Sequence, residues 1–140
     1  MSEQDNLQTT RDTFEARNAH DPERYVKNLN EKWIAESDTM PVPVSGHAAA
    51  KEFMKTYLTA FPDLRFDIDQ MLASGEFVVT RWTASGIHRG PLMGILPTNR
   101  KSVTHGCSVS EFKQGKQAHD WVYWDVANML RQLGVMPGPQ

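Results

Sequence analysis

Apolar residues recur at helical spacing through the first part of the chain. A thin apolar stripe on the charged segment 3–18 predicts an amphipathic helix that rests on a larger element. Asp21 and Pro22 predict the start of a second, short helix, because aspartate caps helix N-termini and proline fits the first turn. A third helix is predicted after Ser45, where apolar and aromatic residues repeat at this spacing until Pro62 ends it.

After Pro62 the apolar period falls from 3.6 residues to 2, which is typical of strands. The alternating segments are 64–69, 76–90, 101–113 and 116–125. Gly75 and Gly115 mark the turns of two hairpins, so the segments predict a meander of about four antiparallel strands. Segment 30–38 fits either a short strand or an extended arm. Residues 126–134 return to helical spacing and predict a terminal helix.

This order of elements predicts an α+β fold. We expect N-terminal helices packed on a curved, mostly antiparallel sheet of four to six strands that forms a cone. The open end of such a cone is a natural pocket for a small molecule. Residues 1–140 fit a single domain, with a loose tail at 135–140.

Charge and composition narrow the expected partners and location. The chain has 15 basic and 17 acidic residues and no basic run, so nucleic acid and anionic membranes are not expected partners. The longest apolar runs are far shorter than the roughly 20 residues that span a bilayer. The lone Cys107 cannot form an internal disulfide, and the first 20 residues contain no apolar run typical of a signal peptide. These features predict a cytoplasmic protein.

The residues indicate neither a metal site nor a loop typical of phosphate-bearing cofactors. The five histidines lack the i, i+4 spacing of a helical metal site, and no pair of cysteines is present. No glycine-rich loop of the kind that cradles phosphates follows a predicted strand.

The last hairpin carries groups suited to acid/base chemistry. Its first strand has a more apolar face, predicted to point inward, formed by Val103, His105, Cys107 and Val109. If the turn at Gly115 has two residues, Asp120 shares the inner face with His105; if the loop has three, Asp125 faces inward instead. We favour Asp120, because Asp125 also fits the N-cap of the terminal helix.

Each of these candidates has a structural alternative. A buried Asp120 would lose hydration, which raises its pKa towards the range of a general acid or base. The alternative is a surface aspartate paired with Lys116. His105 could instead be a core histidine bonded to a backbone carbonyl, and His88 either lines the cone or is exposed at a strand end.

Aromatic and apolar side chains could shape a pocket for a flat hydrophobic or aromatic ligand. The predicted lining residues are Trp33, Met54, Tyr57, Phe61, Trp82, His88, Met93, Trp121, Val122 and Trp124. The alternative is that most of them belong to the core or to a dimer interface. An apolar outer sheet face would need a cover, which favours a homodimer formed through the sheet.

Three C-terminal motifs carry a resemblance to a known family. They are GPLMGILPTNRKSV, FKQGKQ and DVANMLRQLG, at the spacing that the family shows. On these motifs the chain resembles the SnoaL-like polyketide cyclase family, within the nuclear transport factor 2-like cone fold. The resemblance implies a dimeric, cofactor-independent enzyme that closes a ring by intramolecular aldol condensation. In that chemistry a carboxylate removes a proton beside a carbonyl while neighbouring donors stabilise the enolate oxygen.

The family pattern does not carry over cleanly to the site residues. A gap-free alignment places the family's essential aspartate at Val122 and its partner histidine near Ser108, and neither residue can do that chemistry. A two-residue shift places the aspartate at Asp120 instead. Asn99 also stands where the family usually has glycine.

Three hypotheses follow from these observations. The first is an enzyme in which Asp120 is the general acid/base and His105 or His88 polarises a substrate carbonyl. The second is a binding protein of the same fold, favoured by Val122 and Ser108 at the aligned positions. The third is a different reaction in the same cone, such as hydroxylation, isomerisation or epoxide hydrolysis, because fold does not determine chemistry.

Overall fold

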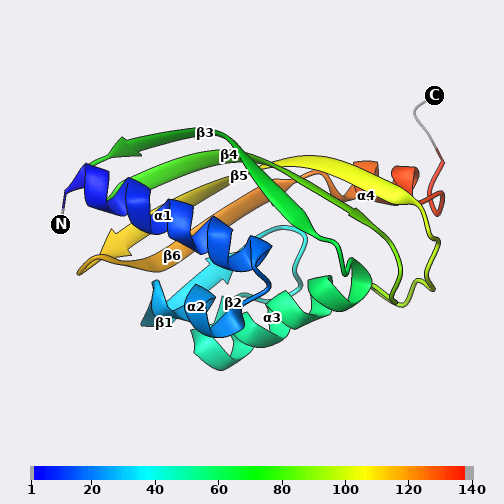
Figure 1. Ribbon diagram of the computed structural model, residues 1–140, viewed down its shortest axis with the longest axis horizontal. Coiled ribbons are helices and arrows are strands. Elements are labelled where there is room, and N and C mark those ends of the chain that lie inside the picture. Colours follow the sequence, from blue (N-terminus) through cyan, green and yellow to red (C-terminus); the bar gives the residue numbers. More distant parts are fainter. Residues whose placement is uncertain (1, 138–140) are drawn as a thin grey trace.

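The structure, a computed structural model, describes residues 2–137 and consists of four helices and six strands (Figure 1). In chain order these are α1 (Glu3–Asn18), α2 (Pro22–Lys27), β1 (Leu29–Glu36), β2 (Val44–Ser45), α3 (Gly46–Ala60), β3 (Arg65–Ser74), β4 (Phe77–Ile87), β5 (Lys101–Lys113), β6 (Lys116–Trp124) and α4 (Val126–Gln132). The helices and the meander predicted from the apolar periods are confirmed.

All six strands form one mixed sheet in the order β2-β1-β6-β5-β4-β3. Strands β3 to β6 form the predicted antiparallel meander. The segment that fitted either a strand or an arm is a strand, β1, which pairs in parallel with β6. Strand β1, from the N-terminal third of the chain, therefore lies beside β6, the last strand. Side chains from both strands can then reach the inner face of the sheet together.

The three N-terminal helices lie on one side of the curved sheet (Figure 1). Asp21 and Asp125 cap α2 and α4 as predicted, each accepting a hydrogen bond from a backbone N–H in the first turn. Ser45 occupies the N-cap position of α3, but its side chain makes no capping hydrogen bond.

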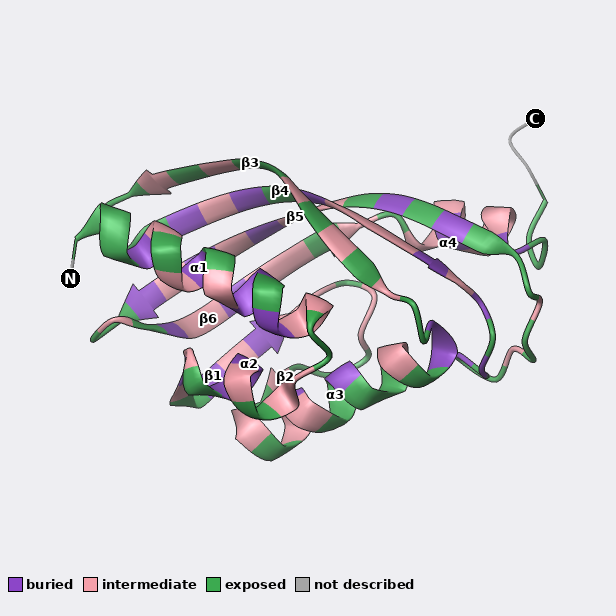
Figure 2. Cartoon of the chain, in the orientation of Figure 1, coloured by how far each residue is buried: buried purple, intermediate pink, exposed green. Residues whose placement is uncertain are grey.

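Along much of β4 and β5, buried residues alternate with half-buried or exposed ones (Figure 2). One apolar cluster joins α1, α2, α3 and β1, and its members are Ala16, Tyr25, Val26, Leu29, Trp33, Ala35, Ala50 and Met54. A second cluster joins the end of α3 to α4, and its members are Ala60, Phe61, Leu92, Met129 and Leu133. The first cluster packs the N-terminal helices against β1, and the second packs the end of α3 against α4.

The β5–β6 hairpin has the predicted two-residue turn but a different register beyond it. Gln114 and Gly115 both have positive φ, at 55° and 78°, as a tight hairpin turn requires. A β-bulge then follows, because Phe112 pairs with Gln117 whereas Glu111 pairs with His119. The extra residue on β6 shifts every later pair by one position relative to the prediction.

The bulge reverses the predicted inner face of β5. Asp120 pairs with Ser110 rather than with Val109, and Val122 pairs with Ser108. The buried residues of β5 are Ser102, Thr104, Ser108, Ser110 and Phe112, so the prediction that Val103, His105, Cys107 and Val109 point inward is wrong. On this more polar face, the Ser110 hydroxyl bonds Asp120 and the Ser108 hydroxyl accepts a hydrogen bond from Trp82.

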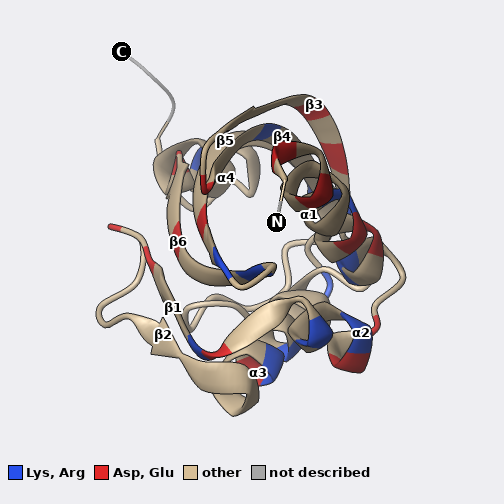
Figure 3. Ribbon diagram, turned by 90° about the vertical axis from the view of Figure 1, so that its left-hand side faces the viewer, with Lys and Arg blue, Asp and Glu red and all other residues tan. Residues whose placement is uncertain are grey.

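Acidic and basic residues are interspersed on α1 and α2 (Figure 3). Within residues 2–137, no helix is long and apolar enough to cross a membrane. Of the predicted loose tail, Val135 and Met136 are exposed, and residues 138–140 lie outside the described part of the chain.

Candidate functional site

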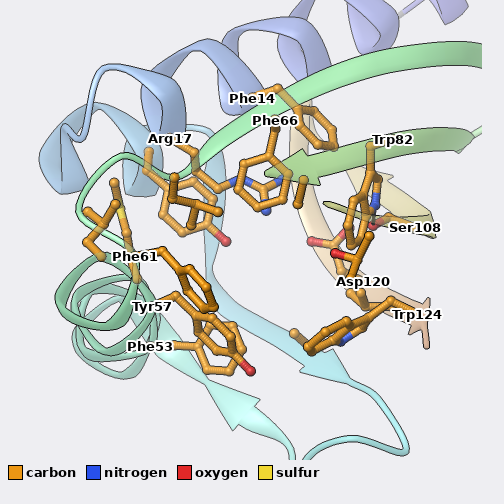
Figure 4. A pocket seen from close by; sticks show the side chains of 18 of the residues that line it. Phe14, Arg17, Phe53, Tyr57, Phe61, Phe66, Trp82, Ser108, Asp120 and Trp124 are labelled. Atoms are coloured by element: carbon orange, nitrogen blue, oxygen red, sulfur yellow. Dashed lines mark hydrogen bonds between the residues drawn. The ribbon is translucent and has the colours of Figure 1, made fainter. Parts of the chain in front are cut away.

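A cavity lies between the inner sheet face and the helices (Figure 4). Its volume is about 160 Å³, roughly ten times what one buried water needs, so it has room for a small molecule. Most of its walls are apolar or aromatic, from α1, α2, α3 and the sheet. The aromatic lining residues are Phe14, Tyr25, Trp33, Phe53, Tyr57, Phe61, Phe66, Trp82 and Trp124.

Only two charged side chains line this cavity within the described residues, Asp120 on β6 and Arg17 on α1. They enter from opposite walls (Figure 4). The remaining polar lining groups are hydroxyls and amides, mostly from β5. An apolar cavity with a few convergent polar groups is the usual form of a small-molecule site.

Asp120 is held by three donors from different parts of the chain. Trp33 on β1 donates its indole Nε1–H to Oδ2 at 2.7 Å. The Ser110 hydroxyl on β5 donates to Oδ1, and Gln117 donates its Nε2–H to Oδ2 at 2.9 Å. Gln117 is itself oriented by Thr13 on α1, whose hydroxyl lies 2.6 Å from Gln117 Oε1. These hydrogen bonds hold the carboxylate in one orientation. The residue is buried, with only 5% of its surface exposed.

Burial raises the pKa of Asp120, because a charged carboxylate loses hydration in the interior. The hydrogen bonds from Ser110, Trp33 and Gln117 and the positive charge of Arg17 act in the opposite direction but do not outweigh burial. The site can also accommodate the protonated form, since the Ser110 hydroxyl can rotate from donor to acceptor. Asp120 is thus able to take up and release a proton in place.

Ser108 supplies a hydrogen-bond donor on the same inner face. Trp82 donates its Nε1–H to Ser108 Oγ at 2.9 Å, which leaves the serine's own hydrogen for another acceptor. Gly106 makes this arrangement possible, because a Cβ there would lie 2.2 Å from Cζ2 of the Trp82 ring. Ser108 lies on β5 two residues from Ser110, the serine that bonds Asp120.

Two tyrosines add buried phenols to the walls. Burial raises the pKa of Tyr25 to about 12 and also raises the pKa of Tyr57. Both therefore stay protonated at neutral pH and can donate hydrogen bonds. Tyr57 packs edge-on against Trp124.

The structure brings together most of the predicted pocket residues. Those that line the cavity are Trp33, Met54, Tyr57, Phe61, Trp82, Val122 and Trp124. Trp121 lies on the outer sheet face, stacked on His119 with ring centroids 3.9 Å apart. Met93 is 52% exposed in the β4–β5 loop, and His88 is fully buried beside Phe61 without lining the cavity.

Neither of the histidines predicted as partners of Asp120 lines the cavity. His105 is exposed on the outer face and lies 2.9 Å from the Thr83 hydroxyl through Nδ1, so the prediction that it shares a face with Asp120 is wrong. His88 accepts a hydrogen bond from the backbone N–H of Thr98 at 3.2 Å. Asp125 caps α4 and does not line the cavity.

The sequence interpretation missed several residues of the site. They are Phe14, Arg17, Tyr25, Phe66, Ser110 and Gln117. One available signal was the spacing of Phe14 and Arg17, three residues apart and so on one face of the predicted helix. No comparable local signal marks Ser110, because the bulge decides which way it faces.

Comparison with protein-family models identifies the family to which this chain belongs. The model of the SnoaL-like polyketide cyclases matches residues 7–133. The chain belongs to the SnoaL-like polyketide cyclase family. The resemblance seen in three C-terminal motifs is thereby confirmed and extends through α1, β1 and the whole sheet.

Solved structures of similar fold include other members and relatives of this family. AclR from Streptomyces galilaeus, a proposed hydroxylase, is 25% identical with a TM-score of 0.88, over 99% of this chain and 87% of its own. IdmH from Streptomyces antibioticus, a proposed polyketide cyclase, is 24% identical with a TM-score of 0.80, over 93% and 99%. An NTF2-like protein of unknown function from Burkholderia pseudomallei is 22% identical with a TM-score of 0.80, over 95% and 98%, which confirms the predicted cone fold. No curated protein sequence matches significantly.

The two positions at which the sequence resemblance would place the family's histidine and aspartate face each other in this SnoaL-like chain. Ser108 and Val122, where the gap-free alignment places the family's histidine and aspartate, pair directly across β5 and β6 and both line the cavity. Asp120 lies two residues from Val122 on the same face of β6. Within the described chain, no three His, Cys, Asp or Glu side chains are grouped so as to hold a metal ion.

Proposed function

We propose that this protein is a SnoaL-like enzyme that performs cofactor-independent acid/base chemistry on a small hydrophobic carbonyl compound, with Asp120 as the proton carrier. One observation carries the proposal: within the described residues, Asp120 is the only carboxylate that lines this mostly apolar cavity. Its burial and its fixed orientation suit a general base, whose pKa must lie near the working pH.

The reaction type that fits best is an intramolecular aldol ring closure. The Asp120 carboxylate takes a proton from the carbon beside one carbonyl, and the Ser108 hydroxyl donates a hydrogen bond to the enolate oxygen that forms. The enolate carbon then bonds to a second carbonyl carbon of the same molecule, whose oxygen takes the proton back from Asp120. The aromatic walls hold the flexible substrate so that the two carbons meet.

Exchange of carbon-bound protons tests this role without knowledge of the substrate. 2-Tetralone, an aromatic ketone with acidic α-protons, is incubated with the protein in D2O and followed by proton NMR. We expect the wild type to accelerate exchange above buffer and Asp120→Asn to lose the acceleration. Asp125→Asn is the matched control, because it changes the other aspartate of this segment and retains a side chain able to cap α4. Equal rates for wild type and Asp120→Asn would remove Asp120 as the base.

Ligand binding without catalysis is a second candidate. It is favoured by Ser108 and Val122, which stand where the family carries its histidine and aspartate. A third candidate, hydroxylation in the same cone, is supported by the similarity to AclR. Tight binding of 2-tetralone with no exchange above buffer would favour the binding protein.

We further propose that the protein forms a homodimer through the outer sheet face. Tyr123 and Val103 are exposed there, at 56% and 38%, beside the half-buried Cys107, Val109 and Trp121. Apolar side chains in such a continuous group favour a partner surface of the same kind. The cytoplasmic location and the absence of a cofactor stay predictions from the sequence.

A further inference from the structure

Arg17 is the one basic side chain that lines the cavity within the described residues. Its guanidinium carbon lies 4.3 Å from the centroid of the Phe14 ring, 4.7 Å from that of Phe66 and 5.5 Å from that of Tyr25. Three aromatic faces thus hold the cation by cation–π attraction and restrict its movement. Figure 4 shows Arg17 beside Phe66, with Asp120 and Ser108 on the opposite wall.

No hydrogen bond from this guanidinium is found within the described residues. Its Nε is buried and has no hydrogen-bond partner among residues 2–137. No carboxylate oxygen in that part of the chain lies within 4.0 Å of it. The two acidic neighbours on α1, Asp12 and Glu15, pair with Arg24 instead.

A cation in such surroundings needs an acceptor. Arg17 is half-buried and its Nε is fully buried, so the guanidinium has lost part of its hydration without gaining a carboxylate, a cost that its aromatic neighbours offset only in part. Within the described residues, Asp120 is the only other charged side chain that lines the cavity, but Trp33, Ser110 and Gln117 already donate hydrogen bonds to its oxygens. The unused donors therefore suit a group that enters the cavity from outside.

We propose that Arg17 binds an anionic oxygen group, a carboxylate or an ionised enol, on a flat hydrophobic ligand. This inference rests on the proposed function, since it concerns the same cavity, and it adds the charge of the ligand. Arginine is suited to the role because its planar guanidinium presents several donors in one plane to such oxygens. With Arg17 bound to the anionic end, the rest of the ligand lies along the aromatic walls towards Ser108 and Asp120.

Pairs of similar aromatic probes, one anionic and one neutral, test the assignment. Binding is measured at pH 7 by quenching of tryptophan fluorescence, with 2-naphthoate against 2-naphthamide for a carboxylate and 4-hydroxycoumarin, ionised at this pH, against coumarin for an enolate. We expect the wild type to prefer at least one anion over its neutral partner by about tenfold, the effect of one charge-assisted hydrogen bond. Preference for 2-naphthoate alone assigns a carboxylate, and preference for 4-hydroxycoumarin alone assigns an enolate.

Three variants connect the preference to Arg17. Arg17→Met keeps the length of the side chain, removes the charge and is expected to bring the ratio of affinities to about one. Arg17→Lys retains the charge without the planar donors and should keep part of the preference. Arg11→Met is the matched control, because Arg11 is exposed on the same helix, and its ratio should equal that of the wild type.

The outcomes separate this inference from the proposed catalysis. If the wild type binds the members of each pair equally, or neither member of either pair, Arg17 has no such role, even where 2-tetralone exchange proceeds. The same holds if Arg17→Met retains the wild-type ratio. If the anion preference depends on Arg17 but exchange does not depend on Asp120, the Arg17 assignment stands and the acid/base function falls.

Discussion

The Nε1–H of Trp33 on β1 lies 2.7 Å from Oδ2 of Asp120 on β6, although 87 residues separate the two in the sequence. The parallel pairing of these strands brings them together, with Ala35 opposite Asp120 in the ladder. The same carboxylate accepts a hydrogen bond from Ser110 on the other neighbouring strand. The carboxylate that lines the cavity is therefore positioned by three adjacent strands at once.

Removal of the indole donor should perturb both stability and Asp120. We expect Trp33→Phe to lower the free energy of unfolding by about 1–3 kcal/mol, because a buried carboxylate loses one of its partners. The pKa of Asp120 should rise further, since the bond from Trp33 lowers it. Urea unfolding and carbon-detected NMR titration measure the two effects. Trp121→Phe, on the outer face, is the control, and an unchanged Asp120 titration in Trp33→Phe would contradict the assignment.

The raised pKa of Asp120 predicts a particular dependence of stability on pH. A group that binds protons more tightly in the folded state contributes stability at low pH, and this contribution is lost as pH rises through the folded pKa. The free energy of unfolding of the wild type minus that of Asp120→Asn should therefore fall as pH rises above about 3.8, the unfolded value, and level off once Asp120 is ionised. Urea unfolding of both proteins between pH 4 and pH 8 measures it. A difference that grows with pH would mean that the hydrogen bonds outweigh burial.

Gly106→Ala should displace the Trp82 ring. The new methyl group would overlap Cζ2 of the indole, so we expect a loss of about 1–3 kcal/mol of stability and of the hydrogen bond to Ser108. Unfolding experiments and the NMR shift of the Trp82 Nε1–H measure these effects. If the cost comes from this overlap, it should be much smaller in a Trp82→Leu background, and additive costs in the double variant would refute the explanation.

The proposed dimer predicts that a charge on the outer face weakens self-association. Tyr123→Glu should shift the protein towards monomer in size-exclusion chromatography with light scattering, because it places an unpaired charge in an apolar contact. Leu96→Glu is the control, since Leu96 is 78% exposed in the β4–β5 loop. A wild type that is monomeric at all concentrations would end this proposal.

Local rules were enough to predict much of the architecture. The change of apolar period located helices and strands, and short-range chemistry predicted the caps at Asp21 and Asp125 and the turn at Gly115. The preference for Asp120 over Asp125 rested on the N-cap role of Asp125, which is a local signal, whereas the β5 register assumed for Asp120 was wrong.

The tertiary structure alone decided how the strands and helices combine their side chains into a site. One extra residue in β6 reversed the predicted inner face of β5, so that Ser108 and Ser110 face Asp120 while His105 points outward. A bulge of this kind reflects contacts between strands and leaves no periodic mark in the sequence. Arg17 reached the cavity for a similar reason. The sequence of α1 predicted only an apolar stripe. The aromatic rings around the Arg17 guanidinium come from α1, α2 and β3, and only the packing of these elements brings them together.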